Sequence, residues 1–191
     1  MKEKRIAVFA SGSGTNAENM FNYFSENEKI MIDSLWANKA SAYALERAKN
    51  HGVETFVFNR EQFYNTDEIV QTLRNRKVDI IVLAGFLWLI PEKLIETFTI
   101  INIHPALLPK YGGKGMYGMK VHEAVVENKE PYSGITIHYV NQNYDEGKII
   151  FQAKCEVHPD DTPEIVAQKV HELEYRYFPS VVEDVLRKMD N

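Results

Sequence analysis

The first half of the chain alternates short apolar segments with longer amphipathic ones, and this order limits the possible folds more than any other feature. Four segments are predicted to be strands, and the first and last of them are almost continuously apolar, as expected of strands that helices cover on both faces. They span residues 5–10, 30–36, 53–58 and 79–84. The stretches between them suit crossover helices near residues 16–27, 40–51 and 66–76. This strand–helix order predicts an α/β fold with a doubly wound, mostly parallel sheet.

Local signals predict where some of the helices begin and end. Gly52 occupies a position typical of a helix-terminating glycine, and Thr66 is a candidate N-cap for the third helix. Residues 161–164 supply an N-cap, an early proline and an acidic first turn for a final helix. The apolar stripe of that helix runs through residues 166–177, and Phe178-Pro179 is expected to interrupt it.

The second half of the chain adds three strand-like segments, which bring the expected sheet to about seven strands. They span residues 99–105, 134–140 and 148–157. The last two are expected to form an antiparallel hairpin at the sheet edge, joined by residues 141–147, a connection longer than a usual hairpin loop. Because no repeat, linker or low-complexity tract divides the chain, we expect one domain over residues 1–191.

Composition narrows the class of protein. The formal net charge of −5 argues against a nucleic-acid binder, since such proteins usually present basic faces. No apolar run approaches the roughly 20 residues that span a bilayer, so no membrane segment is expected. The lone Cys155 cannot form an internal disulfide, and no Cys/His cluster has the spacing of a metal site. We therefore expect a cytoplasmic protein, either a monomer or a homodimer.

A glycine-rich loop follows the first expected strand and leads into the first helix. Its residues are Gly12, Ser13, Gly14, Thr15 and Asn16. Glycines allow the backbone to approach an anion closely, and the free amides at the start of a helix can bind phosphate. The alternatives are a simple strand-to-helix turn or, because Ala17 completes a G-x-G-x-x-A pattern, a nicotinamide-dependent oxidoreductase.

The oxidoreductase interpretation requires an acid near the end of the second strand to hold the ribose of the dinucleotide. That strand ends in Trp36-Ala37-Asn38-Lys39, and the nearest acid, Asp33, lies earlier in the strand. The pattern therefore favours a phosphate site over a dinucleotide site.

A pair of polar residues ends the fifth expected strand. Asn102 and His104 are two positions apart, so their side chains point to the same face, and Pro105 favours extended backbone at His104. An amide beside an imidazole can stabilise an oxyanion and move a proton, or it can simply close a strand end. Asp145 lies in the long connection, where it either orients His104 or belongs to a turn.

Several of these segments together resemble one family. Asn102–Pro109 is similar to the Asn-x-His-Pro-Ser-Leu-Leu-Pro hallmark of folate-dependent formyltransferases, and residues 134–147 are similar to their second signature. Asn38-Lys39-Ala40 and Val82–Phe86 match the glycinamide ribonucleotide formyltransferases within that family. The resemblance extends from about residue 4 to residue 180, and the motifs occur in the order expected of the family.

The resemblance implies a Rossmann-like formyltransferase fold and an enzyme of purine biosynthesis. Such an enzyme transfers the formyl group of 10-formyltetrahydrofolate, its co-substrate, to the primary amine of 5-phosphoribosylglycinamide, without a metal. The implied catalytic set is Asn102, His104 and Asp145. The implied phosphate site is Gly12, Ser13, Gly14, Thr15 and Asn16. The implied substrate contacts are His138 and Glu174. The implied folate contacts are Arg60, Leu87, Trp88, Leu89, Ile90 and Asn102.

Two features depart from the pattern or leave it open. Trp88 stands where bacterial relatives often carry arginine, and the glycine-rich residues 110–118 replace histidines of some relatives. Glu174 borders the apolar stripe of the last helix, where an acid is usually solvent-exposed. Alternative functions are a formyltetrahydrofolate deformylase and, from another class, a catalytically silent folate-binding module.

Overall fold

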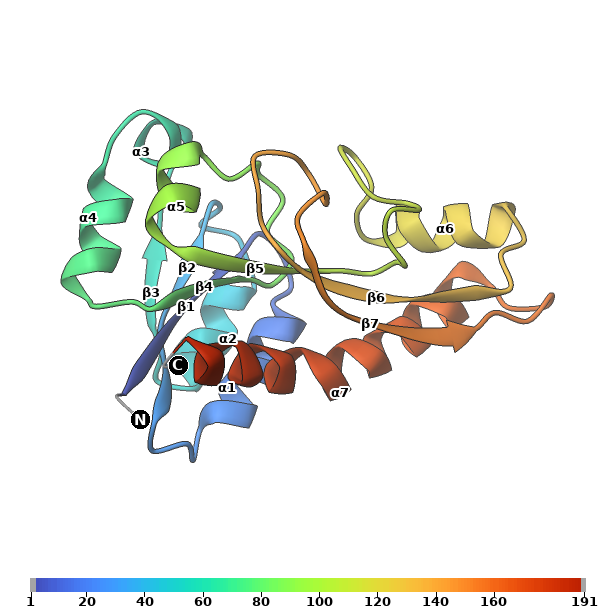
Figure 1. Cartoon of the computed structure of the whole chain (residues 1–191), viewed down its shortest axis with the longest axis horizontal. Helices are drawn as coiled ribbons and strands as arrows, with labels where there is room; N and C mark the ends of the chain where they lie inside the picture. The colour runs from blue at the N-terminus through green and yellow to red at the C-terminus, as the bar shows by residue number, and fades with distance from the viewer. Residues whose placement is uncertain (1–2, 190–191) are drawn as a thin grey trace.

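Seven strands form one twisted sheet in the order β3-β2-β1-β4-β5-β6-β7 (Figure 1). The structure is a computed structural model and describes residues 3–189. The strands are β1 (Lys4–Ala10), β2 (Ile30–Ala37), β3 (Glu54–Val57), β4 (Ile80–Leu83), β5 (Thr99–His104), β6 (Tyr132–Tyr139) and β7 (Ile149–Glu156). The first five in chain order run parallel, whereas β6 is antiparallel to both β5 and β7. The predicted parallel sheet with an antiparallel edge is confirmed.

Helices cover both faces of the sheet, as the apolar strands require. They are α1 (Thr15–Phe24), α2 (Ala44–Asn50), α3 (Arg60–Tyr64), α4 (Glu68–Asn75), α5 (Glu92–Thr97), α6 (Met119–Glu127) and α7 (Pro163–Lys188). In Figure 1, α1, α2 and α7 lie on one face, and α3, α4 and α5 lie on the other. Alternate residues of β1 serve the two faces: Ile6 and Val8 pack into one apolar cluster, and Ala7 and Phe9 into the other. Both faces of β1 are therefore buried.

The last helix differs from the prediction, because Pro179 does not interrupt it. α7 is continuous over 26 residues with Pro179 inside. A proline lacks the N–H that would bond the carbonyl four residues earlier, which here belongs to Tyr175. The Asn19 side chain on α1 donates a hydrogen bond to that carbonyl over 3.0 Å. The partner that proline removes within the helix is thus replaced from a neighbouring helix.

This replacement predicts a measurable stability difference. We expect Asn19→Ala to lower the free energy of unfolding by about 0.5–1 kcal/mol relative to a matched variant, since it removes one hydrogen bond. The matched variant is Asn22→Ala, because Asn22 is exposed on the same helix and its side chain forms no hydrogen bond within residues 3–189. Urea denaturation measures both. Equal changes in the two variants would show that the Tyr175 carbonyl needs no partner.

Other helix boundaries follow local chemistry. Gly52 adopts a left-handed φ of 68° directly after α2, as predicted. The predicted N-cap Thr66 is wrong by one position: Asp67 holds the cap position, while the Thr66 hydroxyl accepts the Glu68 N–H. The sequence patterns do not predict α3, α5 or α6, and the first two, of five and six residues, are too short to show a periodic stripe.

Candidate active site

A cavity of about 670 Å³ opens at the carboxyl edge of the parallel strands. Its volume falls within the usual range for sites that bind small molecules. The strand order reverses between β1 and β4, and ligands of doubly wound sheets bind at this switch point. The loops that follow β1, β4 and β5 line the cavity, together with the β6–β7 connection and parts of α6 and α7. All of the candidate residues except Arg60 therefore converge on this cavity.

The predicted phosphate site, residues 12–16, lines one part of the cavity. Gly14 is the N-cap of α1 with a left-handed φ of 74°, and no side chain caps the helix. The first-turn amides of α1 are consequently free to bind an anion. Arg47 braces the loop from outside: its Nε donates to the Ser13 carbonyl over 2.9 Å, and its guanidinium pairs with Glu18. The loop is thus held ready for a ligand.

Gly14 is required for packing as well as for its backbone angle. A Cβ placed on Gly14 would lie 2.5 Å from the Ala44 Cβ on α2. A larger residue there would displace α2, so it would test folding rather than ligand approach. Gly12 is different, because a Cβ at that position meets no atom within 4 Å. Gly12 is therefore the better position at which to test access to the loop.

The structure brings Asn102, His104 and Asp145 together. The Asn102 Nδ2 lies 3.4 Å from the Asp145 Oδ1, and the His104 Nδ1 lies 3.5 Å from the Asp145 Oδ2. The Gly113 N–H donates to the same Oδ2 over 2.9 Å and fixes the carboxylate. Asp145 itself has a positive φ of 56°, which is uncommon for a residue other than glycine. The β6–β7 connection is thus folded back onto the end of β5.

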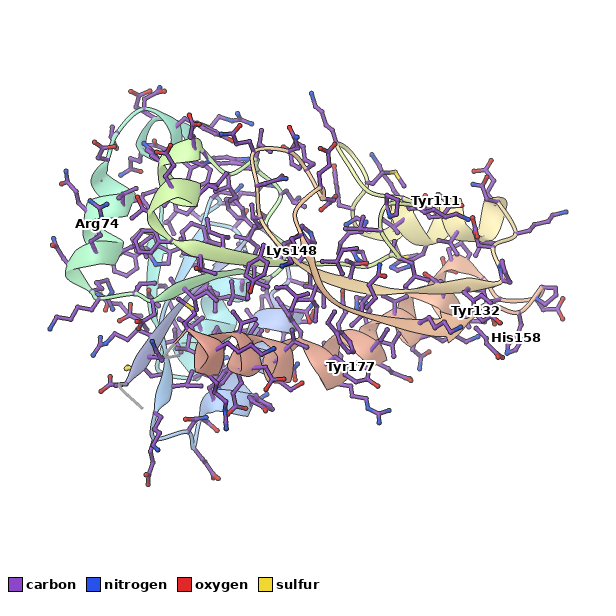
Figure 2. The ribbon with its side chains drawn as sticks, in the orientation of Figure 1. Arg74, Tyr111, Tyr132, Lys148, His158 and Tyr177 are labelled. Carbon is purple, nitrogen blue, oxygen red and sulfur yellow. The ribbon has the colours of Figure 1, made fainter. Side chains whose placement is uncertain are left out.

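Both ring nitrogens of His104 face oxygen atoms. The Nε2–H donates to the Tyr111 carbonyl over 2.7 Å, which leaves Nδ1 directed toward Asp145. The Tyr111 hydroxyl, labelled in Figure 2, donates a hydrogen bond to Glu130 over 3.0 Å, which ties this segment to the turn that follows α6. Burial lowers the pKa of His104, and the Asp145 carboxylate opposes that shift. A proton taken up at Nδ1 would therefore lie between the imidazole and the carboxylate.

His138 supports this group of side chains from β6. It is buried, and its Nδ1–H donates to the Tyr139 carbonyl over 2.9 Å. Its Nε2 lies 3.2 Å from the Asn102 Nδ2 and 3.6 Å from the Asp145 Oδ1. Burial raises the pKa of Asp145, but the contacts with His138, His104 and the Gly113 N–H outweigh it and hold the pKa below its usual value. The carboxylate is therefore charged at neutral pH.

Glu174 on α7 lies inside the cavity wall, so the expectation of a solvent-exposed acid from sequence alone is wrong. It is buried, and its Oε2 accepts hydrogen bonds from Asn16 over 2.9 Å and from His171 over 2.8 Å. Burial occurs because this face of α7 packs against α1, the helix that follows the glycine loop. Glu174 thus connects α7 to the predicted phosphate site.

The predicted folate contacts fall into two places. Leu87, Trp88, Leu89 and Ile90 line the cavity, and the Leu89 carbonyl accepts from the Tyr64 hydroxyl over 3.0 Å. Arg60 is exposed and is not part of the wall. Its guanidinium lies over the Trp88 ring at 4.8 Å from the ring centre. Arg60 therefore reaches the cavity edge only through Trp88, as a cation stacked on an aromatic face.

Asp33, the acid on which the oxidoreductase interpretation depended, has a structural role. It is buried in β2 and pairs with Arg5 at 3.1 Å and with Arg76 at 2.7 Å. It lies four residues before the end of β2, away from the edge where the cavity opens. Among the described residues, the end of β2 therefore carries no acid that could hold the ribose of a dinucleotide.

Sequence patterns did not identify His122 or His171 as parts of the wall, and they left the loop that contains residues 113–119 open between a substrate loop and a simple connector. His122 and His171 lie on α6 and α7, where a histidine within an amphipathic helix carries no distinctive signal. The many glycines of segment 113–119 indicate a loop but not its position. Within residues 3–189, no three or more His, Cys, Asp or Glu side chains gather in a way that could hold a metal ion. None of the helices in that range is long and apolar enough to cross a membrane.

The chain is similar to known formyltransferases along nearly its whole length. A family model described as formyl transferase matches residues 4–182. A chloroplastic phosphoribosylglycinamide formyltransferase from Arabidopsis thaliana is 41% identical over 95% of this chain, which spans 65% of the plant protein. This chain also matches the chloroplastic phosphoribosylglycinamide formyltransferase from Vigna unguiculata, of which it spans 61%. The chain thus covers less than two thirds of these plant relatives.

Bacterial relatives are matched over almost their full length. Phosphoribosylglycinamide formyltransferase from Haemophilus influenzae is 37% identical, with 98% of this chain and 92% of that protein covered. The crystal structure of the protein of that name from Anaplasma phagocytophilum superposes with a TM-score of 0.86 at 34% identity, covering 98% of this chain and 89% of that one. The chain therefore belongs to the formyl transferase family.

Proposed function

We propose that the chain transfers the formyl group of 10-formyltetrahydrofolate to the primary amine of 5-phosphoribosylglycinamide. The observation that carries this proposal is the convergence, in one cavity, of an uncapped helix N-terminus with the Asn102, His104 and Asp145 side chains. The helix N-terminus can hold a phosphate, and the three side chains can support the transfer of an acyl group from one nitrogen to another. Relatives that are named for this activity match the chain over nearly all of its residues.

The two substrates would enter from opposite parts of the cavity. The phosphate of the ribonucleotide would bind at residues 12–16, and Glu174 would lie beside the sugar and amine portion. The flat pterin of the folate suits the apolar segment 87–90. The formyl carbon and the amine would then meet at the end of β5, where Asn102 and His104 lie. This placement brings the reactants into one orientation and lowers the entropic part of the barrier.

The reaction would proceed by direct attack of the amine. Its nitrogen forms a bond to the formyl carbon, and the carbonyl oxygen gains negative charge. The Asn102 amide can donate to that oxygen, because its present contact with Asp145, at 3.4 Å, is long and can be exchanged. The intermediate then collapses as the bond from carbon to the folate nitrogen breaks. One proton leaves the attacking nitrogen and one is delivered to the folate nitrogen.

His104 and Asp145 would manage those protons. Burial lowers the pKa of His104, so the imidazole is mainly neutral before the reaction starts. Negative charge developing nearby favours its protonated form, and Asp145 stabilises that form through the contact with Nδ1. His104 can thus take up a proton at Nδ1 as the oxyanion grows, and Asp145 can relay that proton through water toward the leaving nitrogen.

The function is tested by the release of tetrahydrofolate, followed by ultraviolet absorbance, with and without 5-phosphoribosylglycinamide. We expect release only when the amine is present, with one formylated product formed for each folate released. Release without the amine would identify a deformylase. Binding of the folate without any release would identify a silent binding module, and either result would overturn the proposal.

The phosphate assignment predicts a selective loss of affinity. We expect Gly12→Leu to raise the KM for 5-phosphoribosylglycinamide by about tenfold or more, because the new side chain projects into open space beside the loop. The KM for the folate should change by less than about twofold. Gly12→Ala is the graded control, since its single methyl group leaves more room for the phosphate. A similar rise in both KM values for Gly12→Leu would contradict the assignment.

A further inference from the structure

His122 is a buried cavity residue whose side chain has no hydrogen-bond partner within residues 3–189. It lies on α6, is 2% exposed and lines the cavity wall. Its Nδ1 is fully buried and unpaired, and within residues 3–189 its Nε2 forms no hydrogen bond either. Buried polar atoms in folded proteins nearly always have a partner. A histidine held this way is therefore a candidate for contact with a ligand.

The neighbours of His122 connect it with the predicted phosphate site and with the reacting end of the cavity. The His171 ring lies 6.5 Å away, and His171 bonds the buried Glu174, which in turn bonds Asn16 of the glycine loop. His122 lines the same cavity as Glu174, beside the phosphate end, and His104, at the reacting end, and both are close enough to affect its pKa. Its neighbours thus belong to the half of the cavity assigned to the ribonucleotide.

The charge state of His122 determines what it can bind. Burial, followed by the effect of His171, lowers its pKa to about 4, so the imidazole is neutral at pH 7. A neutral imidazole has one donor nitrogen and one acceptor nitrogen. An unpaired buried N–H is rarer than an unpaired buried acceptor, which favours the proton on Nε2. Nε2 is also the less buried of the two, so it presents an N–H to the cavity.

We infer that the His122 Nε2–H donates a hydrogen bond to an oxygen of the ribose and glycinamide portion of the amine substrate. The inference rests on the proposed function, because it assumes that this substrate occupies the cavity. The acceptor belongs to the part of the substrate that joins its phosphate to its reacting amine, since His122 lines the same cavity as Glu174 and His104. His122 is thus a binding residue that distinguishes the ribonucleotide from a bare amine.

Because Nδ1 is unpaired, melting temperature and substrate affinity together distinguish a binding role of His122 from a structural role. His122→Phe keeps an aromatic ring of similar volume and removes both nitrogens. Removing a buried polar atom without a partner does not lower stability and can raise it. The variant should therefore melt at the same temperature as the parent protein or higher, while it binds the substrate less well. A histidine that served only folding would show the opposite pair of effects.

The experiment compares the parent protein with His122→Phe and His122→Gln. Calorimetric titration with 5-phosphoribosylglycinamide, without folate, gives the affinity independently of turnover. We expect Kd and KM for this substrate to rise about tenfold in His122→Phe, with the folate KM unchanged. His122→Gln, which retains an N–H donor, should recover most of the loss. Val125→Ala is the packing control: Val125 is buried on the same helix and should lower the melting temperature without changing either KM.

Three outcomes of these measurements would contradict the assigned role of His122. Substrate affinity unchanged in His122→Phe, or lost equally for the folate, would overturn the inference. A fall in kcat with unchanged KM would assign His122 a role in chemistry and would also overturn it. If the parent protein itself fails to bind 5-phosphoribosylglycinamide, the proposed function fails, which is a different outcome from equal binding by parent and variant.

Discussion

Replacing Asn102 with alanine is expected to lower turnover by about 100- to 1000-fold, the usual loss for one oxyanion donor. The KM values of both substrates should change little, because this hydrogen bond strengthens only as the carbonyl oxygen gains charge. The present contacts of the amide support this view, since neither the 3.2 Å contact with His138 nor the 3.4 Å contact with Asp145 is short. Steady-state rates at saturating concentrations of both substrates measure the effect.

His104→Ala provides the comparison. It should reduce turnover at least as much, because it removes a proton carrier as well as a stabilising group. The double variant should be far less impaired than the product of the two single losses, since groups that act on one oxygen are not additive. Single-turnover kinetics should show that the chemical step is slowed. If Asn102→Ala stays within a few-fold of the parent protein while chemistry limits the rate, the amide only closes the end of β5.

The parallel part of the sheet was predictable because its signal is local. Strands buried on both faces must be apolar at nearly every position, and β1 and β4 show this without any reference to the rest of the chain. The same-face placement of Asn102 and His104 follows from the period of a strand. These inferences need only a few consecutive residues, so the structure agrees with them.

Features that depend on distant partners were not predictable in this way. Glu174 is buried because α7 packs against α1, and Asn16, 158 residues away in the chain, donates a hydrogen bond to it. Pro179 stays within α7 because Asn19 replaces the missing bond at Tyr175. His122 lines the cavity because of where α6 lies in the fold, and no local sequence pattern predicts that position. In each case the deciding partner lies on another element, so reasoning from spacing alone favours the commoner outcome.

The approach of Asp145 to His104 belongs to the same class. The two residues are 41 positions apart, and their contact depends on the β6–β7 connection folding back over the end of β5. The Gly113 N–H and the close contact between Gly147 and the Tyr139 carbonyl shape that return. A Cβ on Gly147 would lie 1.5 Å from that carbonyl oxygen, so only glycine fits. The signature around Asp145 therefore contains the residues that position it.

Asp145→Asn is expected to lower turnover by about 100- to 10,000-fold, the range that positioned acid–base groups contribute. The substitution keeps the shape of the side chain but removes the charge that favours protonated His104. The other groups that act on His104 are the Tyr111 carbonyl and Glu174, which raise its pKa, and burial and His138, which lower it. With Asp145 neutralised, the balance shifts further toward the neutral imidazole.

The sign of the pH dependence follows from that shift. The pKa of His104 is already lowered by burial, and losing the carboxylate lowers it more. If protonated His104 is required, activity declines as pH rises through this pKa, and the decline in Asp145→Asn begins at lower pH. The ratio of variant to parent activity should therefore fall as pH increases. Rates measured across the pH range in which imidazoles titrate give the activity ratio, and the NMR signal of the His104 ring gives its pKa. A variant whose pH profile is parallel to that of the parent would show that Asp145 acts by positioning the loop and not by its charge.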